Sequence, residues 1–156
     1  MATTGAAGPL LQLDGISRRF GSLKVTDQLT LAVAPGEALG IIGPNGAGKT
    51  TLMNLIAGDL PPDAGTIRFD GRDVTRLGAA QRCRAGIARS YQIPHPFGGL
   101  TVLENVLVGA VFGAGHGERA ARPLALRALE RTGLADKANR LAGSLPLLDR
   151  KRLALA

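Results

Sequence analysis

Residues 43–51 constrain this chain more than any other stretch, because they carry the pattern Gly-x-x-x-x-Gly-Lys-Thr between an apolar run and a helical segment. The apolar run, residues 38–42, is typical of a buried parallel strand, and residues 50–57 continue as a helix that Gly58 ends. Strand, glycine-rich loop and helix in this order predict a loop that binds a nucleoside triphosphate. The residues of this phosphate loop are Gly43, Pro44, Asn45, Gly46, Ala47, Gly48, Lys49, Thr50 and Thr51.

Each residue type in the phosphate loop has a chemical reason. The three glycines allow backbone conformations that turn successive amide N–H groups toward the phosphates. The unpaired amides and the dipole at the start of the helix also favour an anion there. We therefore expect Lys49 to contact the β- and γ-phosphates, Thr50 to ligate Mg²⁺, and Thr51 to donate to the α-phosphate.

The composition excludes several other classes of protein. At 156 residues, 45% of them apolar, the chain is long enough for one domain with a core. The single cysteine, Cys83, excludes an internal disulfide, and residues 1–9 lack the features of a signal peptide and are expected to form a flexible tail. No uncharged apolar run approaches the roughly 20 residues of a membrane-spanning helix. The net charge of +7 is scattered and aromatic residues are scarce, which favours a solvated basic surface over a nucleic-acid site.

Turn residues and apolar spacing predict the remaining strands. Residues 10–16, 29–34 and 66–69 are expected strands, which indicates an antiparallel sheet beside the parallel core. Residues 86–91 are a weaker strand candidate that leads to Gln92.

The second half of the chain predicts a helical lobe. Before this lobe, Thr75 is expected to cap the start of a helix that runs to about Arg84. Within the lobe, Thr101 and Glu104 have the form of a capping box. Pro123 suits the first turn of a further helix, whose end Gly133 indicates. The expected helices span residues 75–84, 101–111 and 123–131.

The order of phosphate loop, glutamine and helical insertion resembles the nucleotide-binding subunits of ABC transporters, above all those of the branched-chain amino acid uptake group. The resemblance extends from about Leu10 onward, and residues 97–104 are similar to that group's sequence after the Q-loop. It implies that Phe20 stacks on adenine and that Gln92 is the Q-loop glutamine, which coordinates Mg²⁺ or holds the attacking water. From the residues alone, core packing is the alternative for Phe20, and an ordinary polar residue at a strand end is the alternative for Gln92.

The same resemblance implies the fold and its domains. An α/β fold of the P-loop NTPase type is expected, with the core and an antiparallel β subdomain in residues 10–92 and the Q-loop and part of a helical subdomain in residues 93–156. Two departures stand out. The family signature Leu-Ser-Gly-Gly-Gln aligns with Leu-Pro-Leu-Leu-Asp at residues 145–149, unless Gly143 and Ser144 substitute for it. The family's strand ending in Asp-Glu has no counterpart, so we expect an incomplete parallel sheet and a truncated chain that hydrolyses little ATP.

The function implied by the resemblance is that of an ATPase that drives solute import. The expected cofactors are ATP and Mg²⁺, with Lys49 and Gln92 acting in hydrolysis, and the expected solute is a branched-chain amino acid. The expected partners are transmembrane permease subunits, a second ATP-binding subunit arranged head to tail and, indirectly, a solute-binding protein. The expected location is the cytoplasmic face of the membrane, with residues 94–100 beside the permease.

Two alternative functions remain open from the sequence. No nucleic acid is expected as a partner, but a soluble ABC-type ATPase that acts on nucleic acid or ribosomes would fit the positive charge. A small-molecule kinase or GTPase would share the phosphate loop. The GTPase alternative lacks an Asn-Lys-x-Asp guanine-binding sequence, and strands that precede the phosphate loop disfavour the kinase.

Overall fold

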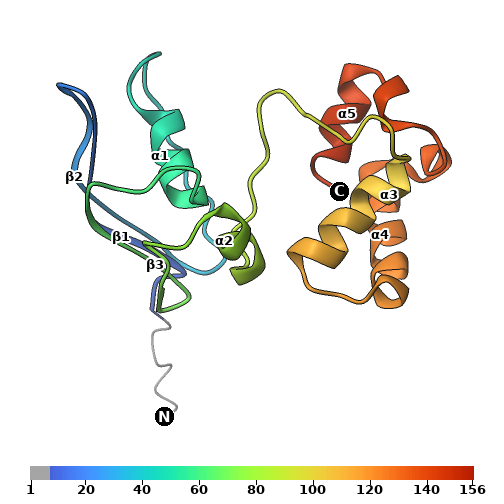
Figure 1. Cartoon of the computed structure of the whole chain (residues 1–156), viewed down its shortest axis with the longest axis horizontal. Helices are drawn as coiled ribbons and strands as arrows, with labels where there is room; N and C mark the ends of the chain where they lie inside the picture. The colour runs from blue at the N-terminus through green and yellow to red at the C-terminus, as the bar shows by residue number, and fades with distance from the viewer. Residues whose placement is uncertain (1–7) are drawn as a thin grey trace, which may run out of the picture. The chain divides into compact units, whose positions relative to one another are not determined.

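The computed structural model describes residues 8–156 and divides the chain into two compact units at the Ala85–Gly86 bond (Figure 1). The flexible tail expected at residues 1–9 therefore falls mostly outside the described residues. Because the division precedes Gln92, this glutamine belongs to the second unit, whereas the phosphate loop and Phe20 belong to the first.

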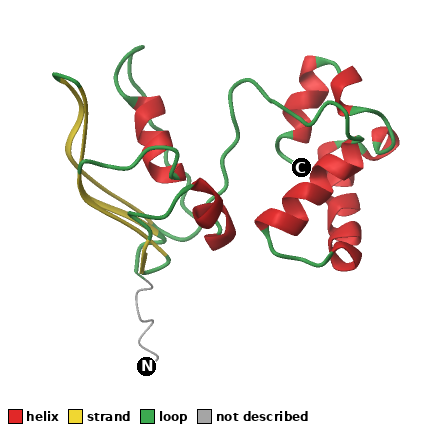
Figure 2. Cartoon of the chain, in the orientation of Figure 1, coloured by secondary structure: helices red, strands yellow, loops and turns green. Residues whose placement is uncertain are grey.

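The first unit contains a four-stranded sheet in which every neighbouring pair is antiparallel, as predicted (Figure 2). Strand β1 pairs with β2 on one side and β3 on the other, and β3 pairs with β4. The order across the sheet is therefore β2-β1-β3-β4. The strands are β1 (Leu11–Phe20), β2 (Leu23–Val33), β3 (Ala64–Phe69) and β4 (Arg72–Asp73).

Strand β1 ends four residues later than predicted. The sequence underestimated its length because irregularities in its pairing interrupt the alternation of apolar and polar side chains. The register with β2 shifts between Leu13 and Ile16, where Gly15 has a φ of 59°. An extra residue in one strand brings positions at an odd spacing onto the same face. Leu13 and Ile16 consequently both reach the core, where they join Ile67 of β3 with 0% exposure.

Helix α1 (Lys49–Ala57) follows the phosphate loop and ends where it was predicted to end. Gly58 adopts a φ of 85° and donates its N–H to the carbonyl of Asn54 at 3.0 Å, a conformation that suits glycine. Helix α2 (Ala79–Ala85) starts later than predicted, so the expectation that Thr75 caps it was wrong. The Thr75 hydroxyl instead accepts from the Ile67 amide and donates to the Ile67 carbonyl, because Thr75 follows β4, which pairs with β3.

Two predicted strands do not form. Residues 38–42 and 86–91 are irregular, and neither segment pairs with any of the four strands of the described residues. Leu39 is 44% exposed and Ile42 is 98% exposed, so this apolar run lines no core. An apolar segment forms a parallel strand only where a neighbouring strand pairs with its backbone N–H and C=O groups. None of the four strands in the described sheet pairs with either segment.

The second unit is helical, as predicted, and the capping box is confirmed. The Thr101 hydroxyl accepts from the Glu104 amide at 3.2 Å, and the Glu104 carboxylate accepts from the Thr101 amide at 2.7 Å. The elements in order are α3 (Val102–Val108), a π-helical turn η1 (Gly109–Gly113), α4 (Glu118–Thr132), the 3₁₀ turns η2 (Ala135–Lys137) and η3 (Ala142–Ser144), and α5 (Leu147–Leu153).

Helix α4 ends at Gly133 as predicted but begins earlier than predicted. Gly117 precedes its first turn and accepts from the amide of Ala121, so Pro123 lies inside the helix rather than in the first turn. The buried face of α4 packs against α3 and α5 in one core. The fully enclosed members of this core include Val102, Leu129, Leu134, Ala142 and Leu145.

Candidate functional site

The phosphate loop has the backbone that its glycines predict. Gly46 and Gly48 both have a φ of 83°, in the left-handed region that side chains disfavour. A Cβ atom on Gly48 would lie 3.0 Å from both the carbonyl oxygen and a methyl carbon of Val25. Gly48 is also the residue before α1, so the chain enters the helix through a position that only glycine fits.

The ammonium group of Lys49 is held by the loop itself. Its Nζ atom donates to the carbonyl of Gly43 at 2.6 Å and to that of Pro44 at 2.7 Å. This geometry places a positive charge against the loop, where an incoming anion would meet it. Lys49 is the first residue of α1, so the charge adds to the positive end of the helix dipole.

The start of α1 suits phosphate groups for a second reason. No side chain caps the helix at Gly48, and the first turn contains no acidic residue. The first-turn amides therefore have no side-chain acceptor, and an anion there would satisfy them. Thr50 is exposed in this turn, and its hydroxyl is an oxygen ligand of the kind that Mg²⁺ takes together with phosphate oxygens. The residues present therefore fit a nucleotide with Mg²⁺.

Phe20 lies at the tip of the β1–β2 hairpin with 44% of its surface exposed, unlike a core aromatic. Val25, on the following strand, lies against Gly48 of the phosphate loop. The hairpin and the loop before α1 extend in the same direction from the first unit (Figure 1). The structure thus brings together, within one unit, the two segments that were expected to contact the base and the phosphates.

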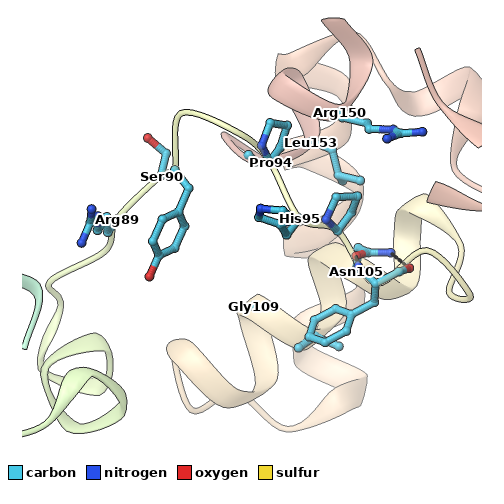
Figure 3. Close-up of a pocket in the computed structure, with 13 residues that line it drawn as sticks. Arg89, Ser90, Pro94, His95, Asn105, Gly109, Arg150 and Leu153 are labelled. Carbon is cyan, nitrogen blue, oxygen red and sulfur yellow. Dashed lines mark hydrogen bonds between the residues drawn. The ribbon is translucent and has the colours of Figure 1, made fainter. Parts of the chain in front are cut away.

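Gln92 belongs to the second unit. It is exposed and sits in a bend, so it does not follow a regular strand as predicted. The segment that contains it borders a cavity of about 370 Å³, together with parts of α3, η1 and α5 (Figure 3). Residues from this segment that line the cavity include Arg89, Tyr91, His95 and Phe97.

Asn105 holds the segment after Gln92 in place, a role that sequence reasoning missed. Its side-chain oxygen accepts from the Phe97 amide at 2.8 Å, and its side-chain nitrogen donates to the Phe97 carbonyl at 3.2 Å. The same nitrogen donates to the carbonyl of Thr101 at 2.8 Å. The available signal was a single amide side chain within the apolar run of α3.

The region aligned with the family signature has its own geometry. Leu147 and Leu148 open helix α5, and both are 61% exposed. Asp149 is turned inward and pairs with Lys137 at 2.7 Å. The hydroxyl of Ser144 donates to the carbonyl of Leu141 at 2.8 Å, so it is engaged locally.

Other site types find no support in the described part of the chain. Within residues 8–156, no group of three or more His, Cys, Asp or Glu side chains is placed to hold a metal ion. Across the same residues, no helix combines the length and the apolar character needed to cross a membrane. Cys83 is an exposed free thiol on α2.

Solved structures resemble this chain closely. MJ1267, an ATP-binding cassette of an ABC transporter, matches in its ADP conformation with a TM-score of 0.76 and 32% identity, covering 94% of this chain and 65% of that one. The cbiO1 protein of Clostridium perfringens, part of the ABC transporter complex cbiONQ, matches with a TM-score of 0.79 and 26% identity, covering 94% of this chain and 59% of that one.

Sequence comparison agrees with the structural one. BraF of Pseudomonas aeruginosa, a high-affinity branched-chain amino acid transport ATP-binding protein, is 35% identical in an alignment 162 positions long that covers 95% of this chain. The chain spans 64% of the length of this relative. The sequence profile of the ABC transporter family matches residues 26–156. Phosphate loop, antiparallel sheet and helical lobe agree with these matches, and the chain therefore belongs to the ABC transporter family.

Proposed function

We propose that this chain is the nucleotide-binding part of an ATPase subunit that drives uptake of branched-chain amino acids. The observation that carries the proposal is the phosphate loop, in which two glycines at positive φ precede a helix and the Lys49 ammonium faces the loop carbonyls. The name of BraF, a branched-chain amino acid transport ATP-binding protein, supports the solute. The alternative of a soluble ATPase that acts on nucleic acid or ribosomes has no comparable support.

The proposed roles follow from positioning and charge, which dominate phosphoryl transfer. Lys49 balances the charge on the β- and γ-phosphates, while the amides at the start of α1 bind their oxygens. Thr51 donates to the α-phosphate, and Phe20 stacks on adenine. Thr50 and Gln92 would hold Mg²⁺, which neutralises charge on the phosphate oxygens during ATP hydrolysis.

The proposed partners are permease subunits in the membrane and a second ATP-binding subunit in a head-to-tail dimer, with a solute-binding protein acting through the permease. The subunit would lie at the cytoplasmic face of the membrane. The cbiO1 protein, which belongs to a transporter complex, supports an assembly of this kind. Residues 94–100, with Phe97 59% exposed beside the cavity, form the surface we assign to the permease contact.

The nucleotide proposal is tested by calorimetry with Mg·ATP and Mg·ADP, while phosphate release is followed in parallel. Lys49→Ala is expected to abolish binding, because it removes the charge that faces the phosphates. Arg72→Ala, which removes an exposed positive charge from the edge strand β4, is the matched control and should bind as the unmodified chain does. Equal binding by all three proteins, or no binding by the unmodified chain, would refute the proposal.

The permease contact is tested in the complete transporter. Phe97→Asp is expected to lower solute uptake and recovery of the permease with the subunit, while ATP binding stays unchanged. Leu126→Asp, on the outer side of α4 at 40% exposure, is the control for introducing an acid at an exposed leucine. Uptake at the unmodified level in Phe97→Asp would remove this surface from the proposal.

A further inference from the structure

The guanidinium of Arg18 lies against the ring of Phe20. Its carbon Cζ is 5.1 Å from the ring centroid, within the range of a cation–π interaction. Both residues lie near the end of β1, and the Arg18 side chain is only 21% exposed. One face of the otherwise exposed Phe20 ring is therefore occupied by a cation from the same strand.

Asp63 fixes the position of that cation. Its carboxylate accepts from Arg18 at 2.7 Å with one oxygen and from the Arg19 amide at 2.7 Å with the other. The Asp63 amide also donates to the carbonyl of Ser17 at 2.9 Å, which docks the turn before β3 onto β1. Since Asp63 is bound at three points along the same stretch of β1, the guanidinium has a rigid anchor.

Packing of the sheet does not explain where the Arg18 side chain lies. The Nε atom of Arg18 is buried and has no hydrogen-bond partner among the described residues. The hydroxyl of Thr26, which lies opposite Arg18 on β2, is also buried and also lacks a partner among them. A buried donor without a partner costs stability, so such a group calls for an explanation other than packing. The guanidinium is held at this position despite that cost, and the ring it contacts is Phe20.

We propose that Arg18 is a positioning residue of the nucleotide site: with Asp63 as its anchor, it holds the Phe20 ring so that the opposite face receives the adenine base. This inference rests on the proposed function and adds to it the group that orders the base platform. An exposed aromatic side chain loses rotamer freedom when a base stacks on it. A ring that is already held against Arg18 loses less, so the base binds more tightly.

The test separates the base from the phosphates by comparing Mg·ATP with magnesium tripolyphosphate, which has no base. Calorimetry is expected to show that Arg18→Met weakens ATP binding about two- to fivefold, the size of the cost of ordering one side chain on binding. Tripolyphosphate binding should be unchanged. Arg18→Lys, which keeps the charge, should lose less affinity than Arg18→Met, and Asp63→Asn should weaken ATP binding in the same direction without removing the guanidinium.

Coupling between Arg18 and Phe20 completes the test. In a Phe20→Leu background, Arg18→Met should weaken ATP binding no further, because the ring through which it acts is absent. Equal losses for ATP and tripolyphosphate, the same loss with and without Phe20, or no loss at all would overturn the inference. These results leave the proposed function intact as long as Lys49→Ala abolishes ATP binding, whereas failure of the unmodified chain to bind ATP overturns both.

Discussion

Replacement of Arg82 by methionine should destabilise the first unit more than any exposed substitution on the same helix. Arg82 lies on α2 with 0% exposure. Its guanidinium donates to four backbone carbonyls at 2.5 to 2.9 Å, and two of them belong to the last turn of α1. Burial lowers the pKa of Arg82, with Asp73 opposing that shift, but the group keeps its proton at neutral pH. The carbonyls are those of Leu55, Ile56, Thr75 and Leu77.

The expected loss follows from what the substitution leaves behind. Hydrogen bonds from a charged donor contribute about 1.5–3 kcal/mol each, and carbonyls without a partner keep their desolvation cost. The substitution also returns part of this energy. The unmodified chain must strip water from the guanidinium when it folds, and the methionine variant has no such cost. We therefore expect Arg82→Met to lower the free energy of unfolding by about 3–5 kcal/mol, a large share of the 5–15 kcal/mol typical of whole domains.

The assay is urea denaturation followed by far-ultraviolet circular dichroism, with hydrogen exchange at the C-terminal end of α1 as a local measure. Arg84→Met, an exposed substitution on the same helix, is the matched control and should change stability by less than about 0.5 kcal/mol. A loss below about 1 kcal/mol in Arg82→Met, or equal losses in both variants, would refute the reasoning, because the four carbonyls would then not depend on the guanidinium.

Three further predictions concern separate features. Gly48→Ala should weaken ATP binding at least about tenfold in calorimetry, because φ is 83° there and the new methyl group would meet Val25 at 3.0 Å; Gly99→Ala, which meets no neighbour, should not. Hydrogen bonds from the Thr101 backbone and side chain lower the pKa of Glu104 below its ordinary value of 4.5. The Glu104 carboxylate therefore stabilises the fold above pH 4.5, and this stabilisation is lost as the pH falls through the lowered pKa of the folded state. Glu104→Gln should flatten that part of the stability–pH curve, and an unchanged curve would contradict the capping role. Asp149→Asn should cost about 2 kcal/mol in urea denaturation because it removes the charge partner of Lys137 at 2.7 Å and of Arg152 at 3.6 Å, and a neutral result would mean that these ion pairs add nothing.

Features set by neighbouring residues were predictable from the sequence. The glycine conformations of the phosphate loop, the capping box of Thr101 and Glu104, and the ends of α1 and α4 at Gly58 and Gly133 all agree with the structure. In each of them the decisive contact joins residues within one or two turns, or a backbone conformation that only glycine adopts readily. Such preferences need no knowledge of the rest of the fold.

Features that depend on distant residues were decided by the tertiary structure. Residues 38–42 are apolar enough for a strand, but no described strand pairs with them, so composition alone was misleading. Thr75 was expected to cap a helix and instead bonds Ile67, which the sheet brings beside it.

The site divides in the same way between sequence and structure. Its proposed phosphate-binding half could be predicted from nine consecutive residues, because one loop supplies the glycines, the lysine and the threonines. The setting of Phe20 could not, because Arg18 is anchored by Asp63, a residue 45 positions further along the chain. The sequence by itself determined which groups are proposed to bind phosphate and where α1 and α4 end. Only the tertiary structure decided which strands pair, which threonine serves the sheet and which cation orders the aromatic ring, since those contacts join residues that lie far apart until the chain folds.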